Sequence, residues 1–400
     1  MTPRRFALHV LFFLTPILIV LGCFEAALWH IGESVPVAKV QRIQKEYPEV
    51  IWGRNFLGQP LQAYKWNGLL IRRPRIAAIG SSRVMQFRPQ MLGTTSAPNL
   101  DFYNCGGLIQ SLEDWENFVY LVPDTALPEV MFFGVDHWWL NPSVRYLAKD
   151  PLAFKHAIAQ DDALDWHAHG AKFQSLIRGN ALRRVLVPAF TGARPDRLGT
   201  LAILKGRGFR ADGSQDYNYR PQPQWRYVDR ATHVRERILQ RNRGFEAGPM
   251  SPEHFARLER SLKTLQQRGV LVCVFAPPIS SEARRLLIQS PIHRDLWNSY
   301  RRLLPELCKR INAPYCDAAS VERFGLDDRS LLDGIHAAET SHLHILRAWL
   351  RDSRVRAALP GTRERVERLL RAPKTNFWFP DYTSTVDFER PPKAEGGRLR

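Results

Sequence analysis

A short apolar run that ends in a glycine and two serines constrains the fold of this chain more than any other stretch. Residues 75–85 read RIAAIGSSRVM, and residues 76–79 are apolar without a polar interruption. Such a run is typical of a strand buried on both faces, and a helix start follows the serines. Open α/β sheets bind ligands at the carboxyl ends of their strands. The sequence therefore predicts a serine hydroxyl at the ligand-binding edge of a parallel sheet.

The alternation of apolar runs and helical patterns recurs along the chain. Ser251 is a good N-cap and Pro252 suits the first helical position, so a helix begins there, and Gly269 can end it. Strands that alternate with helices predict an α/β fold with a parallel sheet and helices on both faces. Besides the first strand, we expect strands over 99–104, 129–134, 270–276 and around 315–316, and helices over 111–121, 252–268, 296–311 and 338–350.

The alternation is interrupted between residues 143 and 250. This stretch mixes Pro, Arg and aromatic residues with short helical runs, such as 180–187, and lacks the apolar strand pattern. Compact domains rarely contain a structureless loop of this length, so we expect an inserted subdomain or a lid. Its aromatic residues and arginines, as in 215–230, suit either a groove for a sugar chain or a small separate core.

A chain of 400 residues exceeds the usual single domain, so additions to one large domain, or two domains, are expected. After Pro360 the chain is rich in Arg, Pro and Gly, and we expect it to wrap the surface or to be partly disordered. The predicted organisation is a membrane anchor (1–28), a juxtamembrane stalk that is partly helical around 40–47 (29–70), the first part of the α/β domain (71–142), the insertion or lid (143–250), the second part of the α/β domain (251–352) and a basic tail (353–400).

The amino-terminal segment predicts a membrane helix. Residues 6–24 carry no formal charge between Arg5 and Glu25, and as a helix they would cover roughly 28 Å, close to the thickness of a bilayer core. Arginines before this segment predict a cytoplasmic amino terminus and a periplasmic or extracytoplasmic body. We favour an uncleaved single-pass anchor. A cleaved signal peptide and lipidation at Cys23 are the alternatives.

The charge balance favours an anionic partner. Lys and Arg total 57 against 39 Asp and Glu, which gives a net charge of +18. An acidic glycan or acidic lipid headgroups would suit such a surface, although arginines scattered over a solvated surface would give the same total. The arginines form no RNA-binding motif and no long basic run, so we predict no nucleic-acid partner.

The cysteines predict neither a metal site nor a redox motif. The five cysteines include no C-x-x-C pair, and no histidines stand at metal-ligand spacing, so we expect no metal and no cofactor. Cys105 and Cys273 fall in or beside predicted strands and suit small core positions. A disulfide between Cys308 and Cys316 stays possible in an exported body.

A second loop can complete a catalytic site with the serine. Asp333 stands three residues before His336, so its carboxylate can bind Nδ1 of the imidazole and leave Nε2 free to take a proton from Ser82. The alternative role for Ser82 is to cap a helix. His342 and His344 are rivals to His336, but we expect them on the following helix as surface or packing residues.

Two further sets of residues are candidates for the site. Backbone N–H groups of Ser82 and Gly107 could stabilise an oxyanion, because a glycine-rich turn lets the backbone approach it closely. Asp136, His137 and Trp138 follow a predicted strand and could bind substrate. The alternatives are an ion pair between Asp136 and an arginine, and core packing of the tryptophans.

Four motifs along the chain resemble the sequence blocks of the SGNH/GDSL hydrolase superfamily. The resemblance covers residues 75–141 and 313–350, and the anchor and the G-S-S variant bring it nearest to the envelope acyl-transfer branch. That branch includes the D-alanine transfer protein of teichoic acid synthesis and the proteins that O-acetylate alginate or cellulose. The motifs are Gly80-Ser81-Ser82, Asn104-Cys105-Gly106-Gly107, Gly134-Val135-Asp136 and Asp333-Gly334-Ile335-His336.

The resemblance implies a three-layer α/β/α sandwich, catalysis by Ser82, His336 and Asp333, and often a polytopic O-acyltransferase partner. Two departures stand out. Ser81 replaces the aspartate of G-D-S, and Asp136 stands where many of these hydrolases have asparagine. An ionised Asp136 cannot donate a hydrogen bond to an oxyanion, and one interpretation is weak hydrolysis with transfer as the main reaction.

The sequence thus predicts an anchored, exported protein that moves a short acyl group onto or off a hydroxyl of an envelope polysaccharide. Two other functions stay open. One is a plain carboxylesterase. The other is a catalytically silent scaffold or glycan-binding partner of a membrane O-acyltransferase.

Overall fold

The computed structural model describes residues 2–55, 57–93, 101–144, 152–160, 196–216 and 228–371. The chain forms two compact units. The first is built mainly from Met1–Pro60 and Gln160–Ala211, and the second from Leu61–Ala159 and Asp212–Glu395. Residues 212–250 of the predicted insertion therefore belong to the same unit as the two halves of the predicted α/β domain.

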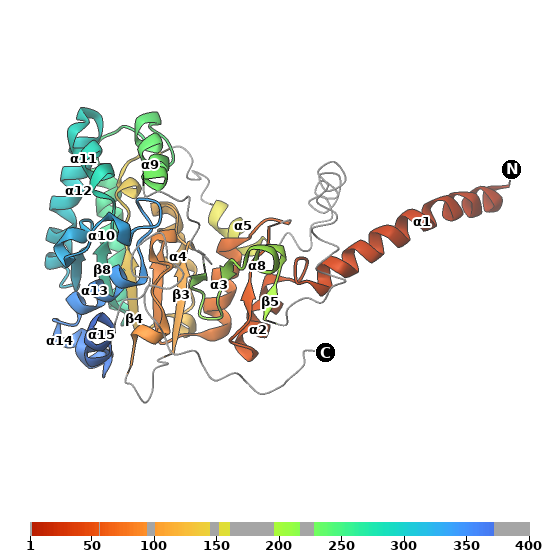
Figure 1. The fold of residues 1–400 in the computed structure, drawn as a ribbon, viewed down its shortest axis with the longest axis horizontal. Coiled ribbons are helices and arrows are strands. Elements are labelled where there is room, and N and C mark those ends of the chain that lie inside the picture. The colour runs from red at the N-terminus through yellow and green to blue at the C-terminus, as the bar shows by residue number, and fades with distance from the viewer. Residues whose placement is uncertain are drawn as a thin grey trace. The chain divides into compact units, whose positions relative to one another are not determined.

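The second unit contains a five-stranded parallel sheet in the order β3-β2-β4-β8-β9 (Figure 1). Strand β2 pairs with β3 and β4, and Ile79 lies opposite Cys105 on one side and Phe133 on the other. The parallel sheet and the mixed α/β character confirm the prediction. The strands are β2 (Ile76–Gly80), β3 (Phe102–Gly106), β4 (Val130–Gly134), β8 (Leu271–Ala276) and β9 (Tyr315–Asp317).

Helices cover both faces of this sheet because alternate strand residues point to opposite faces. Ala77 and Ile79 belong to one apolar cluster and Ile76 and Ala78 to another. The first cluster includes residues of α3 (Leu61–Arg72), α4 (Leu112–Leu121), α5 (Ala153–Ala159), α9 (Val228–Gln240), α10 (Pro252–Gln267), α11 (Ser281–Gln289) and α12 (Pro291–Arg310). The second includes residues of α13 (Glu339–Trp349), α14 (Ser353–Ala358) and α15 (Thr362–Arg371).

Serine caps begin α4, α10 and α11, and at α11 the Ser280 hydroxyl accepts a hydrogen bond from the Ala283 N–H at 3.2 Å. The Ser251 hydroxyl accepts a hydrogen bond from the His254 N–H at 3.2 Å, as predicted, and the Ser111 hydroxyl accepts one from the Asp114 N–H at 3.0 Å. Each cap satisfies one of the N–H groups that have no partner inside the helix.

The carboxyl-terminal part of the described chain belongs to the core. Val366 and Leu369 on α15 are buried in the same cluster as Trp349 on α13. Residues 353–371, which the sequence assigns to a basic tail, are therefore two helices that complete one face of the unit. The remainder of that predicted tail lies outside the described residues.

The parts of the predicted insertion that the structure describes pack against the main core. Phe154 on α5 and Val234 and Ile238 on α9 are buried in the first apolar cluster. The helical run predicted over 180–187 lies outside the described residues, as does most of the stretch 215–230. Residues 215 and 216 form the short strand β7 (Gln215–Asp216).

The first unit begins with the helix α1 (Pro3–His30) (Figure 1). In the described residues this is the one helix long and apolar enough to cross a membrane, with a mean hydropathy of 2.4 over a window that is not buried. By length and composition it is a candidate single-pass anchor, and a signal sequence would satisfy the same criteria. The last two turns of α1 differ from this exposed window, because Phe24, Ala27 and Leu28 are buried.

The segment after α1 is folded and fixed to later parts of the same unit. The buried Glu33 carboxylate accepts hydrogen bonds from the N–H groups of Asn55, Leu57 and Thr200 at 3.1, 2.9 and 2.7 Å, and from the Thr200 hydroxyl at 2.9 Å. The elements here are α2 (Val37–Glu46), β1 (Ile51–Trp52), β5 (Arg197–Leu198), α8 (Thr200–Lys205) and β6 (Gly208–Phe209), and β1 pairs with β5 and β6.

All five cysteines are free thiols. Cys105 on β3 and Cys273 on β8 are fully buried, as expected of small core residues. Cys308 and Cys316 are also buried, but the disulfide that the sequence left possible between them is not formed.

Candidate active site

The candidate nucleophile Ser82 lies immediately beyond the carboxyl end of β2. It is the first residue of the 3-10 helix η1 (Ser82–Val84), and the N-cap of that helix is Ser81, whose hydroxyl accepts a hydrogen bond from the Arg83 N–H at 3.3 Å. Ser81, not Ser82, therefore provides the side-chain cap. The Ser82 hydroxyl is left for another partner.

Ser82, His336 and Asp333 form a hydrogen-bonded line in that order. The Ser82 Oγ lies 2.7 Å from His336 Nε2, and His336 Nδ1 lies 2.7 Å from an Asp333 carboxylate oxygen. All three side chains are half-buried, so the hydroxyl remains accessible to a substrate. The structure thus brings together the three residues that the sequence predicts, although 254 positions separate the serine from the histidine.

The loop from Asp333 to His336 is held by its own backbone and by Ser280, the N-cap of α11. The Leu332 N–H donates to the His336 carbonyl at 2.7 Å, and the Ser280 N–H donates to the Gly334 carbonyl at 2.7 Å. Gly334 has a φ of +87°, which glycine adopts without strain. These contacts fix the direction in which the imidazole points.

The environment of Asp333 keeps its carboxyl group ionised. Burial raises the pKa of this carboxyl, but the charge of His336 and hydrogen bonds from His336 and Ile335 outweigh it, so the pKa lies well below its usual range. The backbone N–H groups of Ile335 and His336 donate to Asp333 Oδ1 at 3.2 and 3.0 Å. An ionised Asp333 accepts the Nδ1–H of His336, which leaves Nε2 as the acceptor for the serine proton.

The two rival histidines pack in the interior or on the surface and do not contact Ser82. His342 is fully buried with its ring edge-on to Phe87, and its nitrogens lie 2.9 and 3.2 Å from the carbonyls of Ala338 and Arg83. Burial lowers the pKa of His342 to about 4. His344 stacks on Phe324. Both positions agree with the packing roles expected for them.

The structure corrects the prediction that the Gly107 N–H is an oxyanion donor. This N–H donates to the Gly80 carbonyl at 2.9 Å and so continues the parallel pairing of β3 with β2. A donor that is already bonded between the strands is not directed at a substrate. Of the two predicted donors, this leaves the backbone N–H of Ser82.

The structure also corrects the prediction that residues 136–138 bind substrate. Asp136, His137 and Trp138 have exposed fractions of 0, 3 and 6 %, so they lie in the interior and not on a substrate wall. Asp136 forms an ion pair with Arg83 at 2.7 Å, which is the alternative that the sequence left open. The His137 ring packs in an aromatic cluster that includes Trp297, 5.4 Å away between ring centroids.

Arg83 is the residue at this site that the sequence analysis missed. It directly follows the candidate nucleophile, yet its guanidinium is buried beneath the site with an exposed fraction of 2 %. A fully buried arginine is rare unless it is paired. The only sequence signal is its position next to Ser82, and burial of that side chain cannot be deduced from position alone.

The described residues contain no group of three or more His, Cys, Asp or Glu side chains that could hold a metal ion.

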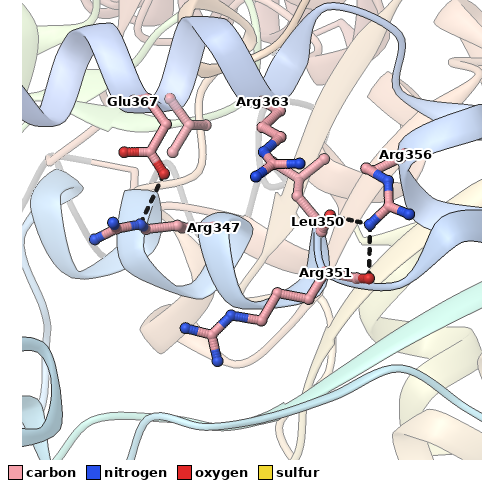
Figure 2. A pocket seen from close by; sticks show the side chains of 7 residues that line it. Arg347, Leu350, Arg351, Arg356, Arg363 and Glu367 are labelled. Carbon is pink, nitrogen blue, oxygen red and sulfur yellow. Dashed lines mark hydrogen bonds and ion pairs between the residues drawn. The ribbon is translucent and has the colours of Figure 1, made fainter.

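A separate hollow of about 370 Å³ is rich in arginine (Figure 2). Arg347 is paired with Glu367 at 2.8 Å, and Arg356 donates to the carbonyls of Leu350 and Arg351. The hollow is lined by Arg347, Leu350, Arg351, Arg356, Arg363, Val366 and Glu367.

The hollow lies away from the candidate triad. Its α14 wall is bonded to the start of β2, because the Ala358 carbonyl accepts a hydrogen bond from Arg75, the residue before that strand. Ser82 follows the other end of β2. Five strand residues separate the two ends, or roughly 17 Å at 3.3 Å per residue.

In comparisons with known proteins, no family model and no curated protein matches the sequence of this chain.

Proposed function

We propose that this chain is a membrane-anchored serine acyltransferase or esterase that acts on O-acyl groups of a cell-envelope polysaccharide. The observation that carries the proposal is the line from Ser82 through His336 to Asp333, with 2.7 Å at each step. A hydroxyl, a base and a group that orients the base are what nucleophilic catalysis by serine requires. A parallel sheet with helices on both faces supports the finer proposal of an SGNH-like three-layer sandwich.

The proposed reaction has two halves. His336 Nε2 takes the proton of Ser82 while Oγ attacks the acyl carbonyl, and the imidazolium then gives this proton to the departing alcohol. The acyl group is left as an ester on Ser82. A second hydroxyl, from the glycan or from water, gives its proton to His336 and attacks that ester, and Ser82 recovers its proton. Asp333 keeps the imidazole in the required tautomer throughout.

Transfer and hydrolysis differ only in the second acceptor. A polysaccharide hydroxyl gives transfer, and water gives a plain carboxylesterase. The buried Asp136 carboxylate, bound to Arg83, offers no hydrogen bond to an oxyanion. Because an oxyanion forms in both reactions, Asp136 does not distinguish transfer from hydrolysis. We include a polytopic O-acyltransferase partner that supplies the acyl group as part of the transfer proposal.

The location that we propose is the cell membrane, with a cytoplasmic amino terminus and an extracytoplasmic body. Helix α1 supports the single span. The net charge of +18 and the arginine-lined hollow support an acidic polymer or an acidic membrane surface as a partner. In this proposal the hollow holds the polymer at a distance from the reacting serine.

Labelling by a fluorophosphonate probe tests the proposal on the full-length chain in detergent. The probe reacts with activated serines, so we expect wild type to be labelled and Ser82→Ala and His336→Ala to be unlabelled. Ser261→Ala is the matched control, because Ser261 on α10 bonds only to the Arg257 carbonyl, and it should label like wild type. Absence of labelling in wild type would favour the silent scaffold. Labelling of Ser82→Ala at the wild-type level would rule out Ser82 as the labelled nucleophile.

Cleavage of nitrophenyl acetate by the protein alone separates the two enzymatic functions. A useful rate that depends on Ser82 would favour the plain esterase. Probe labelling with almost no cleavage would favour transfer.

A further inference from the structure

The guanidinium of Arg83 connects three separate parts of the chain beneath the candidate site. Nε donates to the Ile335 carbonyl at 3.2 Å, Nη1 donates to Asp136 Oδ1 at 2.7 Å, and Nη2 donates to the carbonyls of Pro277, at 2.8 Å, and of Pro278. Asp136 follows β4, the two prolines follow β8, and Ile335 precedes His336 in the catalytic loop. One side chain thus joins the strand ends to the loop that carries the base.

The backbone of Arg83 is fixed as well. Its N–H donates to the Ser81 hydroxyl at 3.3 Å, and its carbonyl lies 3.2 Å from His342 Nε2 on α13. Ser82 therefore stands next to a residue that is held by both its backbone and its side chain.

Charge balance allows this cation to be buried. Asp136 is fully buried against it, and the Trp138 ring lies 5.4 Å from the guanidinium carbon. A buried charge that lost its partner would carry a large desolvation cost, so the pair must be treated as a unit.

We propose that Arg83 is a positioning residue that sets the distance between the Ser82 hydroxyl and His336. The residue after the nucleophile is bonded to the residue before the base, so this contact joins the two loops directly beside the reacting pair. A shift of about 1 Å at a reacting pair can cost about 100-fold in rate. This inference rests on the proposed function, since it assigns Arg83 a role in the same reaction.

The planar guanidinium is essential to this role. It directs several N–H groups at fixed angles, whereas the ammonium of lysine is a single point charge. Arg83→Lys keeps the positive charge opposite Asp136 but cannot reach the carbonyls of Ile335, Pro277 and Pro278 together. We expect its rate of fluorophosphonate labelling to fall about 100-fold, with the probe concentration for half-maximal rate little changed.

Chemical rescue distinguishes positioning from a general loss of structure. Arg83→Ala leaves a space in which added methylguanidine can replace the missing group, and we expect it to restore part of the labelling rate. Arg365→Lys is the matched control. Arg365 on α15 is as buried as Arg83, and its Nε donates to the Gln90 carbonyl. We expect that variant to lose stability and to label at the wild-type rate.

The double variant Arg83→Met with Asp136→Leu covers the case in which single variants fail to fold. It removes both charges and leaves no unpaired ion. A folded double variant that labels slowly supports the proposal. Wild-type labelling rates in a folded double variant or in Arg83→Lys would overturn it. Failure of the proposed function is seen separately, as wild-type protein that does not label at Ser82.

Discussion

Asp333 binds His336 through both of its carboxylate oxygens. Oδ2 lies 2.7 Å from Nδ1 of the imidazole, and Oδ1 accepts the backbone N–H of His336 at 3.0 Å. The residue therefore orients both the ring and the loop that carries it. We expect Asp333→Asn to lower the labelling rate of Ser82 by about 10³- to 10⁴-fold, because the amide favours the wrong tautomer. A variant that labels within a few-fold of wild type would contradict this role.

The low pKa of Asp333 predicts a loss of stability in acid. The folded pKa lies below the unfolded value of about 3.9, so the stabilisation is fully present above about pH 4 and is lost as the pH falls further, toward the folded pKa. The difference in melting temperature between wild type and Asp333→Asn should accordingly shrink below about pH 4. An unchanged difference across that range would contradict the ionised state that we assign to Asp333.

For Lys65 on α3 we expect the stability of the protein to depend on pH in the neutral to alkaline range, and not in acid as for Asp333. The buried Nζ of Lys65 donates to the carbonyls of Asn104 and Gly213, and burial lowers its pKa to about 7. Between pH 7 and about 10 the unfolded chain binds a proton here that the folded chain does not, so the free energy of unfolding rises with pH by at most about 1.4 kcal/mol per unit. Thermal unfolding should show this rise in wild type and not in Lys65→Met. The exposed Lys45→Met is the control, and an identical pH dependence in Lys65→Met would refute the prediction.

Glu33 predicts a specific weakness of the first unit. Each carboxylate oxygen accepts two hydrogen bonds, so Glu33→Gln would turn its NH₂ group toward a backbone N–H in either orientation. We expect a loss of about 1 to 3 kcal/mol in the free energy of unfolding. Glu49→Gln, at an exposed position, should change it little. Equal melting temperatures for the two variants would show that the contacts of Glu33 contribute nothing.

Charge reversal in the arginine-lined hollow tests its proposed partner. An arginine at an anionic surface contributes about 1 kcal/mol, so Arg351→Glu with Arg363→Glu should weaken binding to a soluble polyuronate by about tenfold or more. Arg260→Glu, an exposed change of the same charge on α10, should have a smaller effect. Vesicles of anionic lipid form the second arm, and weakened binding there alone would identify the membrane surface as the partner. Equal binding by all variants in both arms would remove the hollow from the proposal.

Much of the fold could be predicted because strands and helices leave periodic patterns in the sequence. The apolar run at 76–79 lies in β2 and Ser251 caps α10, as predicted. Both features could be predicted because each depends on residues close by in the sequence. The approach of Ser82 to His336 could also be predicted, because strand ends of a parallel sheet meet at one edge.

The corrections concern features that depend on three-dimensional surroundings. The Gly107 N–H can point at a substrate or bond to the Gly80 carbonyl of the neighbouring strand, and which of the two occurs depends on how both segments fold. Asp136 lies inside because Arg83 is there to pair with it, and 53 positions separate them. Nothing in the order of residues shows that a charged side chain after the nucleophile turns inward.

The buried last two turns of α1 determine where a protease can cleave the chain without disturbing the core of the first unit. Phe24, Ala27 and Leu28 contribute to the core of the first unit, and Glu33 ties the next turn to residues near 55 and 200. Cleavage upstream of Phe24 would leave these buried residues attached to the rest of the first unit. Cleavage a few residues later would release a body with an opened core, so a soluble form made for enzymology should keep the end of the helix.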